Sequence, residues 1–189
     1  MLTSAALSCL REHCGMAPAG HLARGRIPFR SVNVPGKAGY TPGLQRHHLL
    51  PRALLHRRAF NRMIGALTPE RIGFHDFRAN GLLLPATESG AQRIGLPLHR
   101  GPHGTYSEMV TERVGQIELG WSRTRRYDPE LAGMEALMRL DLLQRALRRR
   151  LLSPPKGEEI VLNKHDPALD YSHLDRMAEM LWEATESRL

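Results

Sequence analysis

The chain has 189 residues, 41% of them hydrophobic, and carries a formal net charge of +8. Its length and composition allow one packed domain, or a core with a modest addition, and exclude wholesale disorder. No run of 18 or more apolar residues occurs, so a transmembrane helix is excluded and no membrane partner is expected.

The positive charge is concentrated in the first third of the chain. Residues 1–65 hold ten arginines and lysines against a single acid, Glu12, whereas the remainder is close to balance. A basic surface attracts a polyphosphate and gains free energy from the counterions that it releases. A GC-rich genome is the alternative explanation, because 24 of the 27 basic residues are Arg, but it does not explain why acids avoid this third. We therefore expect a phosphate-binding face.

The first residues do not have the pattern of a secretory signal peptide. Residues 1–10 lack a basic lead-in and are followed directly by charged side chains. Cys9 and Cys14 can pair only across a very short loop, so reduced thiols are the simpler interpretation. A small zinc knot that adds His13 and His21 is the alternative. We expect a cytoplasmic protein, or one delivered into a target cell without such a signal.

Four elements are predicted in the first part of the chain. A short helix over residues 4–14 precedes a loop-rich arm, punctuated by glycine and proline, with one short strand near residues 29–34. A strand over residues 46–50 is stopped by Pro51. A helix over residues 52–67 follows, with apolar residues at mostly helical spacing and arginines on its charged side.

The clearest element is a helix that follows a loop over residues 72–79 and a buried strand over residues 82–84. Pro102 suits its first turn. Apolar side chains at spacings of four, four, three and four form one stripe along it: Tyr106, Val110, Val114, Ile117 and Trp121. This periodicity predicts that one face of the helix is buried.

Further helices are predicted over residues 130–150 and 172–187, with a break at residues 153–157 and a strand over residues 159–162. We expect the apolar stripes of these helices to belong to the core rather than to a partner-binding groove.

Four of the ten histidines form two tight clusters about fifty residues apart. The first is the pair His47 and His48, followed by two leucines and a proline, and the second is His99 and His103. Neither cluster is distinctive alone, because a chain rich in histidine contains such pairs by chance. Their order, with an Asn-Gly pair and an apolar strand between them, fits a phosphodiesterase site with one metal ion.

The strand around the first cluster separates the roles of its two histidines. Adjacent strand residues point to opposite faces, so His47 and His48 cannot both face one ion unless the strand bends. One imidazole would bind the metal, and the other would accept a proton from the attacking water. His99 and His103 would complete the ligands, since a spacing of four places them on one helical face, although the Gly-Pro between them makes His103 the firmer ligand. The alternatives are a structural zinc site and ordinary core histidines.

Three stretches of the chain resemble the AHH family of nucleases, part of the HNH/endonuclease VII superfamily. The resemblance covers about residues 43–123, and the Ala-His-His motif that names the family reads Arg46-His47-His48 here, with both histidines intact. The stretches are Gln-Arg-His-His-Leu-Leu-Pro at residues 45–51, Asn-Gly-Leu-Leu-Leu-Pro at residues 80–85 and His-Arg-Gly-Pro-His-Gly-Thr-Tyr at residues 99–106.

The resemblance implies an α+β fold that is mostly helical, with a ββα-metal finger core, an added N-terminal arm and C-terminal helices. We accordingly divide the chain into a basic arm at residues 1–42, an HNH-like nuclease core at residues 43–125 and a C-terminal helical extension at residues 126–189.

The resemblance also implies the roles of individual residues. His47 would be a metal ligand, with His99 and His103, and His48 would be the general base. Asn80 matches the central Asn of the family, whose amide would hold the strand that bears His48; a simple turn residue is the alternative. The ion would be one zinc or magnesium, with manganese and nickel also compatible.

Two arginines flank the predicted ligands. Arg46 and Arg100 are candidates to hold the scissile phosphate bidentately, and ordinary surface arginine is the alternative for each. Asp76 is expected to cap a loop rather than to bind metal.

The predicted function is that of a metal-dependent endonuclease, acting on DNA rather than RNA and with little sequence preference, because no base-reading element is evident. The resemblance also implies a biological role as a bacterial toxin, with an acidic immunity protein as partner. Two alternatives stay open, namely a nucleic-acid- or protein-binding module with structural zinc, and an RNase on the same finger. His48 separates the first alternative from an enzyme, because a structural site has no use for a fourth, unligated imidazole.

Overall fold

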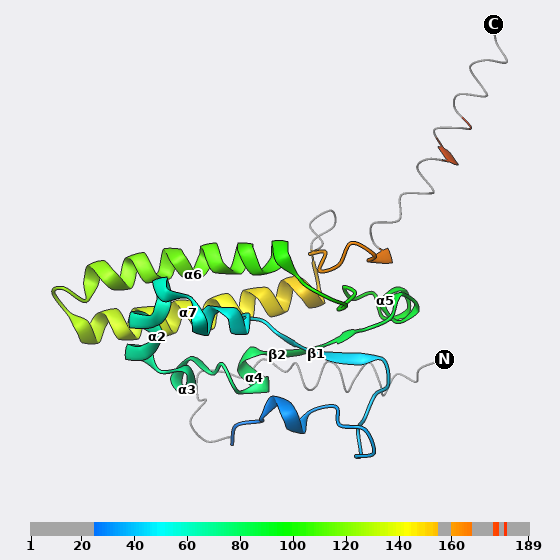
Figure 1. Ribbon diagram of the computed structural model, residues 1–189, viewed down its shortest axis with the longest axis horizontal. Helices are drawn as coiled ribbons and strands as arrows, with labels where there is room; N and C mark the ends of the chain where they lie inside the picture. The colour runs from blue at the N-terminus through cyan, green and yellow to red at the C-terminus, as the bar shows by residue number, and fades with distance from the viewer. Residues whose placement is uncertain (1–24, 155–159, 168–175, 178–179, 181–189) are drawn as a thin grey trace, which may run out of the picture.

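The computed structural model describes residues 25–154, 160–167, 176, 177 and 180 of the chain. The helix predicted over residues 4–14, the alternative zinc knot around Cys9 and most of the helix predicted over residues 172–187 lie outside these described residues. Within them the fold is α+β and mostly helical, as the sequence predicted, with one two-stranded antiparallel sheet (Figure 1).

The sheet pairs strand β1 (Leu44–His48) with strand β2 (Gly81–Pro85). His47 lies opposite Leu82, which is buried, and His48 lies opposite the first residue of β2. The strands predicted over residues 46–50 and 82–84 are confirmed as β1 and β2, although β1 begins and ends two residues earlier than expected. The two leucines that follow β1 are fully buried, so this end of the sheet enters the core.

The helix predicted over residues 52–67 is wrong in its first half. The chain there forms two 3-10 turns, η2 (Arg52–His56) and η3 (Arg58–Phe60), and only then helix α2 (Asn61–Leu67). Arg57 interrupts them with an extended backbone. A continuous helix would point side chains six residues apart in directions about 120° from each other, at about 100° per residue. The interruption instead lets Leu54 and Phe60 both reach the core.

Three short helices were not expected. Helix α3 (Pro69–Ile72) lies mostly before the predicted loop, helix α4 (Phe77–Asn80) forms at its end, and helix α5 (Glu88–Ile94) follows β2. Asp76 caps α4 by accepting a hydrogen bond from the backbone N–H of Arg78, which confirms its expected role as a cap. These helices have one or two turns, too short for an apolar periodicity to show.

Two long antiparallel helices pack against the shorter helices and turns (Figure 1). Helix α6 (Gly104–Thr124) buries the whole predicted stripe from Tyr106 to Trp121, and helix α7 (Pro129–Leu152) packs against α6 and against α2, α3 and α4. One core therefore runs from the sheet into the helical pair. Among the described helices none is both long and apolar enough to cross a membrane.

Two predicted strands are absent from the described residues. Near residues 29–34 the chain forms a 3-10 turn, η1 (Phe29–Ser31), and only Pro28 makes a bridge, to Asp76. Proline has no N–H to donate to a strand ladder, which limits pairing at this point. Residues 160–162 are also not a strand. They lie beside the loop before α6, where the backbone carbonyl of Leu162 accepts a hydrogen bond from the side chain of His103.

Candidate active site

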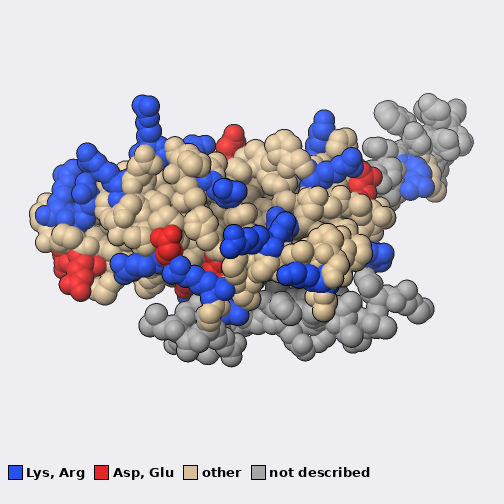
Figure 2. Space-filling view, turned by 60° about the horizontal axis from the view of Figure 1, so that its bottom comes forward, with Lys and Arg blue, Asp and Glu red and all other residues tan. Residues whose placement is uncertain are grey.

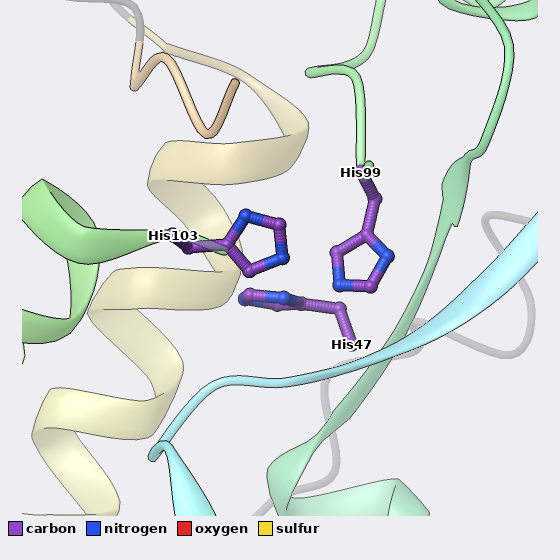
Figure 3. A group of neighbouring side chains, drawn as sticks. All are labelled: His47, His99 and His103. Carbon is purple, nitrogen blue, oxygen red and sulfur yellow. The ribbon is translucent and has the colours of Figure 1, made fainter. Parts of the chain in front are cut away.

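Three of the predicted site histidines converge in space (Figure 3). His47 comes from β1, His99 from the loop before α6, and His103 is the N-cap residue of α6. One nitrogen from each ring lies within 4.8 Å of the other two. The ring centroids are 5.0 Å apart for His47 and His99, 5.6 Å for His47 and His103, and 4.5 Å for His99 and His103.

The loop between His99 and His103 makes this convergence possible. Helical spacing is not the reason, because α6 begins only at Gly104. Gly101 instead takes a left-handed backbone conformation with φ +76°, which glycine adopts without steric cost. The backbone N–H of His99 donates to the carbonyl of Pro85 over 2.7 Å, which holds the start of the loop against the end of β2.

Hydrogen bonds orient two of the rings. Nδ1 of His99 lies 3.2 Å from Oε1 of Gln45, and Nδ1 of His103 lies 3.0 Å from the carbonyl oxygen of Leu162. A carbonyl oxygen only accepts, so Nδ1 of His103 carries a proton, and in the neutral form of the ring Nε2 then keeps a lone pair. Metal-binding histidines have this pattern, with one ring nitrogen donating to an oxygen while the other binds the ion.

The third ring has a buried nitrogen without a partner. His47 is 3% exposed, and its Nε2 makes no hydrogen bond with any described residue. An unpaired buried polar atom is costly and calls for an explanation. A divalent ion between the three rings supplies one, and three neutral imidazoles are suitable donors for it. The residues therefore fit one metal ion.

Burial keeps two of these rings uncharged. It lowers the pKa of His47 to about 2, with further lowering by His99, His103 and His48. Burial also lowers the pKa of His99 to about 4, followed by the effect of His103. Both rings are thus neutral near pH 7, which is the form that binds metal.

His48 lies on the other face of β1, as strand alternation requires. Its ring stacks on Phe29, with centroids 3.7 Å apart and an angle of 2° between the planes, and Phe77 meets Phe29 edge-on at 5.2 Å. Burial lowers the pKa of His48 to about 4, and Arg52, His75 and Arg46 lower it further. The half-buried ring makes no hydrogen bond within the described part of the chain, so its nitrogens are left for water or substrate.

Asn80 is fully buried at the end of α4 and connects the residues just after His48 to the loop before that helix. Its Oδ1 accepts from the N–H of Leu50 over 2.7 Å, and its Nδ2 donates to the carbonyls of Leu50 and Phe74, each over 3.2 Å. Its own carbonyl accepts from the N–H of Leu49 over 2.9 Å. A simple turn residue does not make so many buried hydrogen bonds. Asn80 therefore links the chain after β1 to the start of β2 and to the loop before α4.

The structure does not bring the two candidate phosphate-binding arginines into the histidine group. Arg46 is exposed on the same face of β1 as His48 and donates to the carbonyl of Phe29 over 2.9 Å. Arg100 is exposed beside the loop, with Nη1 4.0 Å from Oε1 of Glu88. Both guanidinium groups are accessible.

Sequence reasoning missed three contributors to this site. Gln45 is exposed but lies on the same side of β1 as His47, a placement that strand alternation alone would have indicated. Phe29 and Leu162 come from segments distant in sequence. No local sequence pattern predicts the stacking of Phe29 on His48 or the hydrogen bond from His103 to Leu162.

Comparison with known proteins identifies the family. A model of the AHH family, described as a nuclease family of the HNH/ENDO VII superfamily with conserved AHH, matches residues 29–146. No curated protein and no solved structure matches the chain. Since the match spans well over half of the 189 residues and includes every histidine of the group, the resemblance seen in the sequence motifs is confirmed, and the chain belongs to the AHH family of nucleases.

Proposed function

We propose that this nuclease is a metal-dependent endonuclease that hydrolyses phosphodiester bonds in DNA with little sequence preference. The observation that carries the proposal is the unpaired Nε2 of His47, which is buried between two rings whose Nδ1 atoms are already engaged. Membership of a nuclease family makes nucleic acid the substrate.

His47, His99 and His103 would hold one divalent ion. Three nitrogen donors suit zinc or nickel, and magnesium and manganese are the other candidates. When bound, the ion would polarise a phosphoryl oxygen and stabilise charge on the departing oxygen.

His48 would be the general base. It is neutral near pH 7, because burial and nearby arginines lower its pKa, so it can accept a proton from the attacking water. Phe29 covers one face of the ring and leaves its nitrogen edge without a protein partner among the described residues. Asn80 would act indirectly, because it fixes the backbone of Leu49 and Leu50 directly after the base.

Arg46 and Arg100 would bind the scissile phosphate. Arg46 shares a strand face with His48, and Arg100 follows His99 directly in the chain, so one arginine adjoins the proposed base and the other adjoins a proposed ligand. A guanidinium can donate two parallel hydrogen bonds to a phosphate.

The molecular surface supports a phosphate-backbone substrate. Basic side chains are spread along the face shown in Figure 2, where acidic side chains are fewer. Contacts of this kind bind nucleic acid without reading its sequence. Residues 43–125 would form the nuclease core, with residues 1–42 as a basic arm and residues 126–189 as an extension. A toxin role, with an acidic immunity protein as partner and action in the cytoplasm or after delivery into a target cell, is the setting that we propose.

The experiment that tests the proposal is incubation of the purified chain with plasmid DNA and with total RNA, each with and without a chelator. We expect plasmid cleavage that stops on chelation and returns when a divalent ion is added back. If only RNA is cleaved, the substrate is RNA and the proposal of a DNA substrate is wrong. Tightly bound metal with no cleavage of either would favour a binding module with a structural zinc site.

A further inference from the structure

A short segment beyond α7 lies against the loop that carries two of the three candidate metal ligands. Residues 160–167 follow the end of α7 and return to the head of α6, next to residues 98–103. Three separate contacts join the two segments.

The first contact reaches a ligand directly. The carbonyl oxygen of Leu162 accepts the Nδ1 proton of His103 over 3.0 Å. This bond selects the tautomer whose Nε2 lone pair is free, and it fixes the rotation of the ring. Leu162 is 4% exposed and belongs to the hydrophobic core, so its carbonyl is held in place by packing.

The other two contacts hold the backbone of the loop. Oδ2 of Asp166 accepts from the N–H of Leu98 over 2.7 Å, between residues that are 6% and 0% exposed. Nδ2 of Asn163 donates to the carbonyl of Arg100. A charged acceptor makes the first of these bonds strong, and its burial makes loss of the acceptor costly.

The segment is itself closed by local bonds. Oδ1 of Asn163 accepts from the N–H of His165 over 2.8 Å, and the carbonyl of Asn163 accepts from the N–H of Asp166 over 3.0 Å. The same asparagine therefore orders the turn and contacts the loop.

We propose that Leu162, Asn163 and Asp166 are positioning residues of the metal centre. They set the tautomer of His103 and the path of the chain between His99 and His103. They lie beyond residue 146, where the match to the family ends, so in this chain the metal centre is completed by a segment outside the matched part. The inference rests on the proposed function, because it assumes that these histidines bind the ion.

The expected effect is on metal affinity. Direct partners of metal ligands typically contribute about 10–100-fold in affinity. Asp166 and Asn163 act through the loop and through the turn that holds Leu162, so Asp166→Ala and Asn163→Ala should each raise the Kd for zinc by up to roughly that factor. Asp166→Asn keeps an oxygen that can accept from Leu98 and should restore most of the affinity. Lys164→Ala, which changes an exposed side chain of the same turn, is the matched control and should bind zinc as the wild type does.

The measurement uses the full chain, freed of metal by chelation and titrated with zinc against a competing fluorescent chelator. The thermal midpoint of each metal-free variant checks its fold, and Asn163→Ala serves if Asp166→Ala does not fold. Nitrogen chemical shifts of metal-free wild type should show the proton of His103 on Nδ1.

Each outcome decides between the two proposals. Zinc binding by the wild type with unchanged Kd in both alanine variants, or a His103 proton on Nε2, overturns the inference and leaves the metal centre standing. Absence of zinc binding by the wild type overturns the proposed metal-dependent function and the inference together.

Discussion

Two neighbouring histidines on one strand have entirely different surroundings. His47 faces two other imidazoles and the ring of Tyr106, whereas His48 faces Phe29 and basic side chains. A period of two along a strand is sufficient to produce this difference. The division of labour that we propose between a ligand and a base would therefore have a geometric origin in β1.

The first prediction concerns the base. His48→Ala should reduce plasmid cleavage by roughly 10²–10⁴, the usual contribution of a positioned general base, while bound metal and thermal midpoint stay close to wild type. Cleavage rates and metal content measured on the same preparation check this. His47→Ala is the comparison, because it should lose the metal as well. A normal cutting rate, or loss of metal on changing His48, would show that the roles are assigned wrongly.

The second prediction concerns pH. The pKa values of His47, His48 and His99 are lowered in the folded protein, from 6.5 to about 2, 4 and 4. Below about pH 6.5 the unfolded chain binds protons at these positions while the folded chain does not, so stability falls as the pH falls. The metal-free protein should accordingly lose stability steadily from about pH 6.5 to about pH 4, where His48 and His99 also protonate in the folded state.

Urea unfolding of the chelated protein between about pH 4 and about pH 7.5 measures this slope. The double variant His48→Gln, His99→Gln isolates the histidine contribution from that of carboxylates, and it should show a shallower dependence. Identical slopes for the variant and the wild type would contradict the lowered pKa values.

At the scale of elements, the two-stranded sheet and the short helices α3 and α4 are supported by hydrogen bonds from helix α7. A two-stranded hairpin is at best marginally stable by itself. Here α7 supports it, because Arg148 donates to the carbonyls of Arg78 and Ala79 at the end of α4, over 2.7 and 3.2 Å. Gln144, on the same helix, donates to the carbonyl of Ile72 over 3.4 Å. The helix α7 therefore belongs to the same folded unit as the two strands and helices α3 and α4.

The third prediction belongs to this scale. Asn80→Ala removes three side-chain hydrogen bonds that join the chain after β1 to the loop before α4, and leaves buried backbone groups of Leu50 unpaired. Each such group costs about 1–3 kcal/mol. The variant should keep its metal, since no ligand is removed, but should cleave more slowly and unfold at a lower temperature.

Metal content, plasmid cleavage and thermal midpoint test this directly, and Asn61→Ala, at an exposed position, is the control. Cleavage by Asn80→Ala at the wild-type rate would mean that the cross-link has no part in placing His48.

At the scale of the whole molecule, exposed arginines extend well away from the histidines. Arg62 lines a groove of about 730 Å³ together with Arg71 and Arg125, and the guanidinium of Arg125 lies 4.7 Å from the ring centre of Trp121. This groove is near the end of α6 opposite His103. The 21 residues of α6 span roughly 31 Å at about 1.5 Å per residue, comparable to about nine base pairs of duplex DNA.

The fourth prediction follows from this distribution. Four arginines between β1 and the end of α2 are exposed, and changing all of them to glutamine should weaken binding of a DNA duplex whatever its sequence: Arg52, Arg57, Arg58 and Arg62. The plot of log affinity against log salt should become flatter by roughly 0.9 for each phosphate that the variant no longer neutralises. Binding is measured with chelated protein, so that no cleavage occurs.

A control of equal charge separates phosphate binding from a general effect of net charge. It replaces four exposed arginines of the two long helices: Arg113, Arg139, Arg145 and Arg149. We expect this control to change the salt dependence much less. Equal effects of the two sets would place the DNA-binding surface elsewhere.

Local periodicity was sufficient to specify the main elements that carry the candidate site. The alternation in β1, the apolar run of β2 and the stripe from Tyr106 to Trp121 were all predicted, because neighbouring residues on one strand or helix suffice to define them. The two histidine clusters and the nuclease family were also evident from the sequence.

How these parts are completed depends on tertiary contacts. The interruption at Arg57, the stacking of Phe29 on His48 and the bond from His103 to Leu162 involve groups far apart in the chain. A 3-10 turn or an irregular segment has no periodicity of its own, so its conformation follows from the partners that it meets. The sequence therefore indicates which imidazoles are candidate ligands, while the surrounding fold determines which nitrogen of each ring is left for an ion.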